Sequence, residues 1–273
     1  MNADARSVAE PGAPKPDPIL VVDDVRKAFG GLLAVDVEHL EISRGIITAI
    51  IGPNGAGKTT LFNLLTGFDR PDTGSWEFDH QRIGGKRAHQ IARAGMVRTF
   101  QLTKALAKLS VIENMLLAAP GQRGERFLGG IVGGWRTQEE RNTERADELL
   151  ARFNLTQVRD DFAGSLSGGQ RKLLEMARAL MAGPRLLMLD EPMAGVNPAL
   201  TQSLLGHITA LRDEGMSVVF VEHDMDAVME ISDWVVCMAE GKIIAEGPPA
   251  AVAGNPAVID AYLGRRHGEA SHA

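Results

Sequence analysis

The stretch that decides the fold is Gly52-Pro-Asn-Gly-Ala-Gly-Lys-Thr59, a complete instance of the pattern G-x-x-x-x-G-K-[ST]. The apolar run Ile46–Ile51 stands directly before it and is long enough for one strand. The helical run Thr60–Phe68 follows it. A strand, a glycine-rich loop and a helix in this order are typical of a phosphate-binding loop. The alternative, an ordinary glycine-rich turn before a helix, does not account for the complete pattern with both flanks in place.

Phosphates need backbone N–H groups that point inward, and glycines let the backbone curl closely enough to offer them. The positive end of the following helix adds to the attraction. We expect Lys58 to bridge the β- and γ-phosphates of a nucleotide and Thr59 to place its hydroxyl on Mg²⁺. The candidate nucleotide contacts in this stretch are Gly52, Pro53, Asn54, Gly55, Ala56, Gly57, Lys58, Thr59 and Thr60.

Outward from the loop, short apolar runs alternate with segments of helical spacing. The continuous runs, which fit strands buried on both faces of a parallel sheet, are Ile46–Ile51, Leu186–Leu189, Val218–Val221 and Val235–Met238. Helices between such strands predict an α/β fold. Before the loop, alternating apolar residues predict half-buried antiparallel strands: Val35, Val37, Leu40 and Ile42.

Composition divides the chain into parts. Residues 1–18 contain four prolines and are expected to be disordered. The core is expected over 19–102 and 184–254, with an inserted, mainly helical subdomain over 103–183 that includes a glycine-rich, mobile loop at 121–134. Residues 255–273 are expected to form a C-terminal helix and tail, since Asn255-Pro256 supplies a cap and a proline at the first helical position.

The overall composition excludes several classes of protein. The chain has 273 residues, a formal net charge of -6 and one cysteine, Cys237, expected in the core. The charge gives no global basic field for nucleic acid, and one cysteine excludes an internal disulfide framework. No run approaches the ~20 apolar residues that cross a bilayer, and the N-terminus lacks the apolar core of a secretory signal. We therefore expect a cytoplasmic protein.

Two acids end the buried run at Leu186-Leu-Met-Leu-Asp-Glu191. A buried strand rarely ends in two carboxylates without cations or hydrogen bonds to receive them. Asp190 would hold Mg²⁺, and Glu191 would orient and polarise an attacking water as general base. An acid cluster at a helix start is the alternative for the pair alone, but the phosphate-binding loop upstream favours the functional interpretation.

The stretch Leu166-Ser-Gly-Gly-Gln170 predicts a helix start with a capping box between Ser167 and Gln170. Two glycines in a first turn weaken the helix by roughly 0.5–1 kcal/mol each relative to alanine. Gly168 and Gly169 are easier to explain if a ligand approaches the exposed N–H groups. The sequence thus predicts a second phosphate-binding helix start.

Taken in order, Gly52–Thr59, Gln101, Leu166–Gln170, Asp190-Glu191 and His223 resemble the motifs of the nucleotide-binding subunits of ABC transporters, over about residues 19–250. The resemblance implies a P-loop, RecA-like core with an antiparallel β lobe and a helical subdomain. It also implies an ATPase in which two subunits pair head to tail. Each ATP then lies between one phosphate-binding loop and the other subunit's signature helix, where Ser167 and Gly169 would contact the γ-phosphate.

The same resemblance assigns roles to single residues. Phe29 would stack on adenine, with a core aromatic as the alternative, and Val35 would also belong to the nucleotide site. Gln101 would bind the Mg²⁺ and report the γ-phosphate and metal to a membrane subunit, with an ordinary polar loop residue as the alternative. His223 would contact the γ-phosphate as a switch histidine. Asn197 departs from the family pattern, which has an acid there, and puts the coupling between two ATP sites in doubt.

A finer resemblance is to the importer ATPases for branched-chain amino acids. It rests on four stretches: Val97–Gln101, Leu109–Met115, Ala194–Pro198 and Asn255–Gly264. Importers of urea or short amides and exporters of lipopolysaccharide remain alternatives. An ABC ATPase of DNA repair or translation is the rival from another class, and a non-hydrolysing regulatory binder is a third option. The negative net charge and the absence of long insertions weigh against an ATPase of DNA repair or translation. Glu191 and His223 weigh against a non-hydrolysing binder.

The resemblance also implies partners. They are a second ATPase subunit, a paralogue or a second copy, and two transmembrane permease subunits at the cytoplasmic face of the inner membrane. An extracytoplasmic solute-binding protein would act indirectly, and no nucleic acid is expected. The permease is expected to dock on the segment Leu102–Met115, where apolar side chains stand among few charges.

Overall fold

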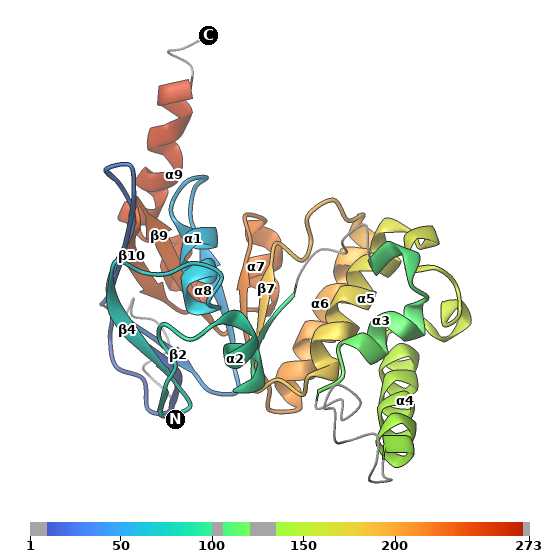
Figure 1. Ribbon diagram of the computed structural model, residues 1–273. Helices are drawn as coiled ribbons and strands as arrows, with labels where there is room; N and C mark the ends of the chain where they lie inside the picture. The colour runs from blue at the N-terminus through green and yellow to red at the C-terminus, as the bar shows by residue number, and fades with distance from the viewer. Residues whose placement is uncertain (1–9, 100–105, 121–134, 270–273) are drawn as a thin grey trace, which may run out of the picture.

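The computed structural model describes residues 10–99, 106–120 and 135–269 of the chain. Its fold is α/β, with two sheets beside a group of helices (Figure 1). The smaller sheet is antiparallel and has the order β2-β1-β4-β5. Its strands are β1 (Pro18–Phe29), β2 (Leu32–Ser43), β4 (Thr73–Phe78) and β5 (Gln81–Arg82). Alternate residues of β2, Val35 and Val37, are buried, as the alternation predicted.

The larger sheet has six strands in the order β10-β9-β3-β8-β7-β6. They are β3 (Ile47–Ile51), β6 (Met96–Arg98), β7 (Leu186–Asp190), β8 (Ser217–Val221), β9 (Trp234–Ala239) and β10 (Lys242–Gly247). All neighbouring pairs are parallel except β9 and β10. Every residue of β3 and β8 is buried, because both faces of the sheet are covered.

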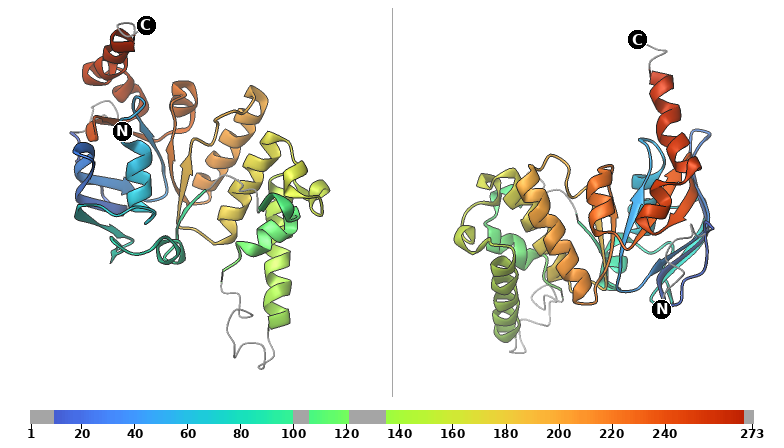
Figure 2. Two further views of the ribbon diagram at one scale, coloured as in Figure 1. Left: turned by 45° about the horizontal axis from the view of Figure 1, so that its top comes forward. Right: turned by 180° about the vertical axis from the view of Figure 1, so that it is seen from behind.

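Helices cover this sheet and extend it on one side. Those packed around the core are α1 (Lys58–Leu65), α2 (Ala88–Arg93), α6 (Pro198–Asp213), α7 (Met225–Ile231), α8 (Pro249–Ala253) and α9 (Pro256–Glu269). A separate group holds α3 (Val111–Leu117), α4 (Trp135–Arg152) and α5 (Gly168–Met181). Figures 1 and 2 show this group at one end of the molecule and α9 at the other. None of the helices in the described ranges is both long and apolar enough to span a bilayer.

Two hydrophobic cores meet at the large sheet. Ile50 of β3 faces a core shared with the antiparallel lobe and α1. Its neighbours Ala49 and Ile51 face the other core, which includes α4, α5 and α6. Successive side chains of β3 therefore point into two different hydrophobic cores, so both faces of the strand carry apolar residues. This explains the continuous apolar runs in the sequence.

Residues 10–18 are the described part of the segment 1–18 that was expected to be disordered, and hydrogen bonds hold part of it against the sheet. The backbone N–H groups of Gly12 and Ala13 donate to Glu246 Oε1, at 2.8 and 3.1 Å. Lys15 Nζ donates to Glu246 Oε2 at 2.8 Å, and Trp234 Nε1 donates to the same oxygen at 3.0 Å. Glu246 is fully buried, so its carboxylate requires these donors, and they hold residues 12–15 against β9 and β10. Composition alone could not indicate this anchor because it lies more than 230 residues away.

Candidate functional site

Strand topology brings the predicted motifs to one edge of the large sheet. β3, β8 and β7 are parallel neighbours, so their carboxyl ends lie side by side (Figure 1). The phosphate-binding loop follows β3, Asp190-Glu191 ends β7, and His223 follows β8. In the register, Val221 stands opposite both Ile50 and Asp190. Segments far apart in the sequence thus form one site.

The loop Gly52–Thr59 requires glycine at two points for reasons of packing. Gly52 has φ 145° and Gly57 has φ 100°. A Cβ atom on Gly52 would lie 2.1 Å from the Met238 carbonyl oxygen, and one on Gly57 would lie 2.3 Å from the Ala34 carbonyl oxygen. The loop is therefore wedged between β9 and β2, and its curl does not depend on a bound ligand.

Lys58 lies across the mouth of this loop. Its side chain is buried, and Nζ donates to the Gly52 carbonyl at 2.6 Å and to the Pro53 carbonyl at 3.1 Å. Asn54, Gly55 and Thr59 are exposed around it. A buried ammonium beside the exposed N-terminus of α1 favours anions, as a phosphate site requires. The loop residues therefore fit a nucleotide phosphate chain.

Glu191 has an unusual backbone. Its φ is 45°, in the left-handed region that few residues other than glycine adopt. Its N–H donates to the Val221 carbonyl at 3.0 Å, and its carbonyl accepts from Ala194 N at 3.1 Å and from Lys172 Nζ at 3.4 Å. Such strain costs about 1–3 kcal/mol and persists where the surroundings impose it. Glu191 lies directly after β7, and its side chain is exposed at the sheet edge.

Asp190 pairs with a residue that sequence reasoning missed, Arg98 at the end of β6. Arg98 Nη2 donates to Asp190 Oδ2, and Nη1 donates to Asn63 Oδ1 at 2.6 Å. The guanidinium also lies over the Phe62 ring, 5.6 Å from its centroid. Arg98 thus links the acid that ends β7 to helix α1. Only the parallel pairing of β6 with β7 brings the two together, so no local signal indicated it.

The described residues contain no cluster of three or more His, Cys, Asp or Glu side chains able to hold a metal ion. Mg²⁺ does not need one, because it binds through one or two carboxylates together with phosphate oxygens and water. Thr59 is exposed and Asp190 keeps 23% of its side chain accessible. A hydroxyl and a carboxylate therefore fit a magnesium ion that a nucleotide brings with it. Gln101, the third predicted ligand, lies outside the described residues.

His223 follows β8 with its side chain largely exposed, 62% accessible. The residue before it, Glu222, is buried, and its Oε2 lies 3.7 Å from His223 Nδ1. Burial raises the pKa of the Glu222 carboxyl, and the nearby Glu191 charge raises it further. Sequence reasoning assigned no role to Glu222.

The start of α5 forms the predicted capping box. Gln170 N donates to Ser167 Oγ at 3.3 Å, and Ser167 N donates to Gln170 Oε1 at 3.0 Å. The two glycines between them differ. A Cβ on Gly169 would lie 1.9 Å from Leu200 Cδ2, whereas a Cβ on Gly168 would meet no described atom within 4 Å. Packing within the described chain therefore explains Gly169 but not Gly168.

The two residues assigned to the base side of the nucleotide differ in exposure. Phe29 is 50% exposed at the end of β1, and Lys27 Nζ lies 5.2 Å from its ring centroid. The alternative of a core aromatic is therefore wrong. Val35 is fully buried, and its Cα would lie 3.2 Å from a Cβ on Gly241, next to the loop. Its backbone borders the site while its side chain belongs to the core.

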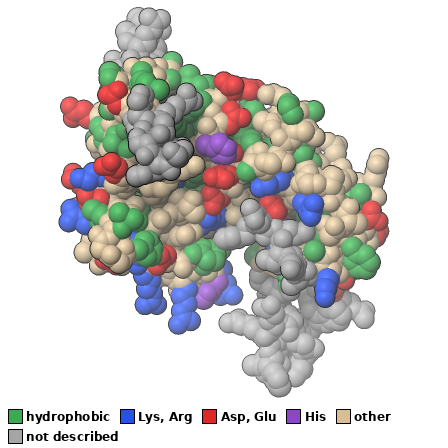
Figure 3. Space-filling model, turned by 90° about the horizontal axis from the view of Figure 1, so that it is seen from above, with side chains coloured by type: hydrophobic (Ala, Val, Ile, Leu, Met, Phe, Trp, Pro, Cys, Tyr) green, Lys and Arg blue, Asp and Glu red, His purple; other side chains and the backbone are tan. Residues whose placement is uncertain are grey.

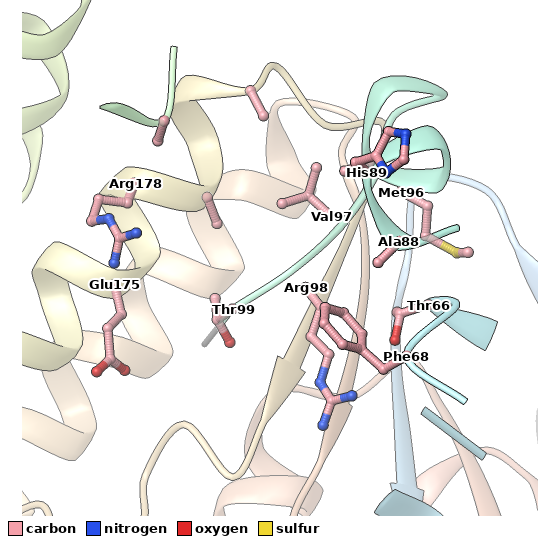
Figure 4. A pocket seen from close by; sticks show the side chains of 14 residues that line it. Thr66, Phe68, Ala88, His89, Met96, Val97, Arg98, Thr99, Glu175 and Arg178 are labelled. Carbon is pink, nitrogen blue, oxygen red and sulfur yellow. The ribbon is translucent and has the colours of Figure 1, made fainter. Parts of the chain in front are cut away.

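A pocket of about 300 Å³ lies between the sheet and the helical group (Figure 4). Its walls come from α2, β6 and α5, with Ala88, Arg98 and Arg178 among the lining residues. The expected docking segment Leu102–Met115 does not form these walls within its described part, 106–115. Val111 and Met115 are fully buried in the helical core, because α3 packs on α4 and α5. These two side chains therefore pack into their own subdomain and are not available for docking.

Comparison with known proteins gives consistent matches. The sequence profile described as "ABC transporter" matches residues 35–194, and that described as "Branched-chain amino acid ATP-binding cassette transporter" matches residues 242–268. The chain is 43% identical to a probable branched-chain amino acid transport ATP-binding protein, LivG, of Archaeoglobus fulgidus, covering 92% of this chain and 97% of the relative. It is 44% identical to the high-affinity branched-chain amino acid transport ATP-binding protein BraF of Pseudomonas aeruginosa, covering 90% and 98%.

Solved structures agree. A nucleotide-free ATP-binding cassette from an ABC transporter superposes with a TM-score of 0.79 at 37% identity, covering 90% of this chain and 98% of that one. The ADP conformation of an ATP-binding cassette of an ABC transporter superposes with a TM-score of 0.77 at 34% identity, covering 90% and 99%. The α/β fold with an antiparallel lobe is thus shared with these cassettes.

Proposed function

The chain belongs to the ATP-binding subunits of ABC transporters, and from this premise we propose that it powers the uptake of branched-chain amino acids through a membrane permease. As a member of the family it binds ATP and hydrolyses it in a reaction coupled to transport. The observation that carries the proposed site is the edge where β3, β8 and β7 end together. The phosphate-binding loop, Glu191 and His223 meet there.

The loop holds the phosphates of ATP. Its backbone N–H groups and the N-terminus of α1 face the β- and γ-phosphates, and Lys58 Nζ exchanges its loop carbonyls for phosphate oxygens. Phe29 stacks on adenine at the exposed end of β1, which its accessible ring supports. Binding therefore uses groups that the fold has already arranged, so little ordering entropy is lost.

Glu191 performs the proton chemistry. Its carboxylate accepts a proton from water as the water oxygen attacks the γ-phosphorus, the bond to the β-phosphate oxygen breaks, and ADP leaves. The proton then passes to the released phosphate. His223 holds the γ-phosphate from the end of β8 and keeps the developing charge in place.

Mg²⁺, when bound with ATP, supplies positive charge that neutralises the phosphate oxygens. Thr59 and Asp190 are the proposed protein ligands, with Gln101 as the third. Asp190 forms its ion pair with Arg98 in this structure, so we propose that the arginine holds the carboxylate ready at the edge.

A second ATPase subunit completes the site. Ser167, Gly168, Gly169 and Gln170 lie at the exposed start of α5, where they would face the nucleotide bound by the other subunit. The open space around Gly168 supports this role. Whether that subunit is a paralogue or a second copy does not change the geometry.

Two permease subunits would bind the ATPase dimer at the cytoplasmic face of the membrane and change conformation as it hydrolyses ATP. The pocket between α2 and α5 is the proposed docking groove for a short permease helix. On the face seen in Figure 3, charged side chains of both signs are mixed among apolar ones. Together with the net charge of -6, this favours a protein partner over nucleic acid.

Branched-chain amino acids are the proposed cargo. The A. fulgidus and P. aeruginosa relatives carry this substrate in their names, and the C-terminal profile match covers β10, α8 and most of α9. A solute-binding protein outside the membrane would select the amino acid, since the proposed site is for ATP and the fold by itself specifies no cargo.

Replacing Glu191 with Gln tests the proposed site. Glu191→Gln should keep ATP binding and lower hydrolysis by roughly 10²–10⁴, because an amide cannot accept the proton of the attacking water. Glu240→Gln is the matched control, since Glu240 is also an exposed glutamate after a strand with positive φ, 50°. It should hydrolyse ATP at the wild-type rate. Wild-type turnover in Glu191→Gln would remove Glu191 from the mechanism.

A further inference from the structure

Glu222 is a buried acid at the edge of the candidate site. Only 1% of its surface is accessible, although it lies between the end of β8 and the exposed His223. A buried carboxylate is costly unless hydrogen-bond donors compensate for the lost water. An apolar residue would fill the same space at lower cost, so the groups that Glu222 contacts are informative.

Its two oxygens bind two different segments. Met193 N donates to Glu222 Oε1 at 2.9 Å, and His223 N donates to Glu222 Oε2 at 3.2 Å. Met193 stands two residues after Glu191, in the turn that the Ala194 N–H closes on the Glu191 carbonyl at 3.1 Å. The Glu222 carboxylate thus links the turn that follows Glu191 to the backbone of His223.

Among the described residues, no backbone hydrogen bond joins the two segments beyond the ends of β7 and β8. The ladder between β7 and β8 ends at the pair Asp190 and Val221, so Met193 and His223 lie beyond its hydrogen bonds. The bond from Glu191 N to the Val221 carbonyl, 3.0 Å, is the last backbone link between these strands among the described residues. Further out, Glu222 provides the connection.

We propose that Glu222 is a positioning residue for ATP hydrolysis, which fixes the turn after Glu191 against the backbone of His223. Both side chains then hold one relative orientation around the γ-phosphate. This rests on the proposed roles of Glu191 and His223. A misplacement of about 1 Å in such a constellation costs roughly 10²-fold in rate. The alternative is that Glu222 satisfies two backbone N–H groups for stability alone.

Two substitutions of graded severity distinguish these roles. Glu222→Gln keeps one acceptor oxygen and can bind one of the two N–H groups, whereas Glu222→Leu binds neither. Steady-state ATP hydrolysis by the full chain, scaled to the folded fraction in urea titrations, should show kcat lowered about 10-fold for Gln and about 10²-fold for Leu. The KM for ATP should stay within about twofold, because the phosphate-binding loop is intact.

Glu246 supplies the matched control, as a fully buried glutamate that accepts hydrogen bonds from other segments and lies outside the site. Glu246→Gln and Glu246→Leu should lower stability and leave kcat of the folded chain unchanged. A kcat within about twofold of wild type in Glu222→Leu would overturn the proposal. It would also be overturned if the loss of activity came entirely from a smaller folded fraction or from a raised KM for ATP. Failure of the proposed function would show separately, as wild-type turnover in Glu191→Gln.

Discussion

Gly168 and Gly169 stand next to each other at the start of α5 but lack a side chain for different reasons. Gly169 leaves room for Leu200 of α6, since a Cβ there would lie 1.9 Å from Leu200 Cδ2. Gly168 faces space that contains no described atom within 4 Å. Packing within the described chain therefore does not explain its missing side chain, which fits the proposed approach of a nucleotide bound by a second subunit.

Alanine at each position separates packing from pairing. Gly169→Ala should lower the free energy of unfolding by about 0.5–1.5 kcal/mol, because the half-buried Leu200 side chain must leave its present rotamer to admit the methyl group. Gly168→Ala should leave it within about 0.5 kcal/mol of wild type but weaken ATP-driven dimer formation by Glu191→Gln subunits. Urea unfolding and size-exclusion chromatography with ATP measure the two quantities. Dimers of undiminished strength in Gly168→Ala would argue against a nucleotide at this helix start.

At the scale of elements, α2 and α5 form opposite walls of the pocket in Figure 4. A charged side chain introduced into this pocket should weaken the proposed docking of the permease. Ala88→Glu places a carboxylate in the pocket at the first helical position of α2, where the helix dipole favours an acid and folding is spared. We expect it to reduce co-purification with the permease subunits and transport, while ATP binding by the free chain is kept.

Gln90→Glu is the control for that substitution. It adds the same charge to the same turn of α2, but Gln90 is exposed and does not line the pocket. Its side-chain oxygen accepts from Arg87 N at 3.0 Å, and a carboxylate keeps this bond. Equal loss of the permease in both variants would mean that charge on α2 acts at a distance, and the pocket would lose its assigned role.

The elements also show where sequence reasoning works. Fully buried strands such as β3 and β8 were predictable because apolar runs record burial on both faces. The capping box of α5 was predictable because its members are three residues apart. Arg98 and Glu222 were not, since each acts through a contact that only the strand order creates. For the expected docking segment, the local pattern could not distinguish an exposed apolar patch from the side chains of α3, Val111 and Met115, which pack into the core.

At the scale of the whole molecule, the N-terminal residues 12–15 are bound to β10, near the other end of the chain. Glu246 accepts hydrogen bonds from residues 12, 13 and 15 and from Trp234. Removing residues 1–17 should lower the free energy of unfolding by roughly 1–3 kcal/mol or more, because a buried carboxylate loses three donors. Removing residues 1–9 keeps those donors and should change stability little. Thermal unfolding of the two truncations measures the difference, and equal midpoints would contradict the anchor.

The six-stranded sheet belongs to both hydrophobic cores, since β3 sends Ile50 to one and Ile51 to the other. Two lobes with separate cores could melt one after the other. Here the loss of either core would strip the same strands of half their covering and expose the other core to water. We therefore expect the lobes to unfold as one cooperative unit, without a stable half-folded species that proteases could cleave. On this expectation, a destabilising substitution in the antiparallel lobe lowers the amount of folded ATPase as much as an equally destabilising one in the helical group.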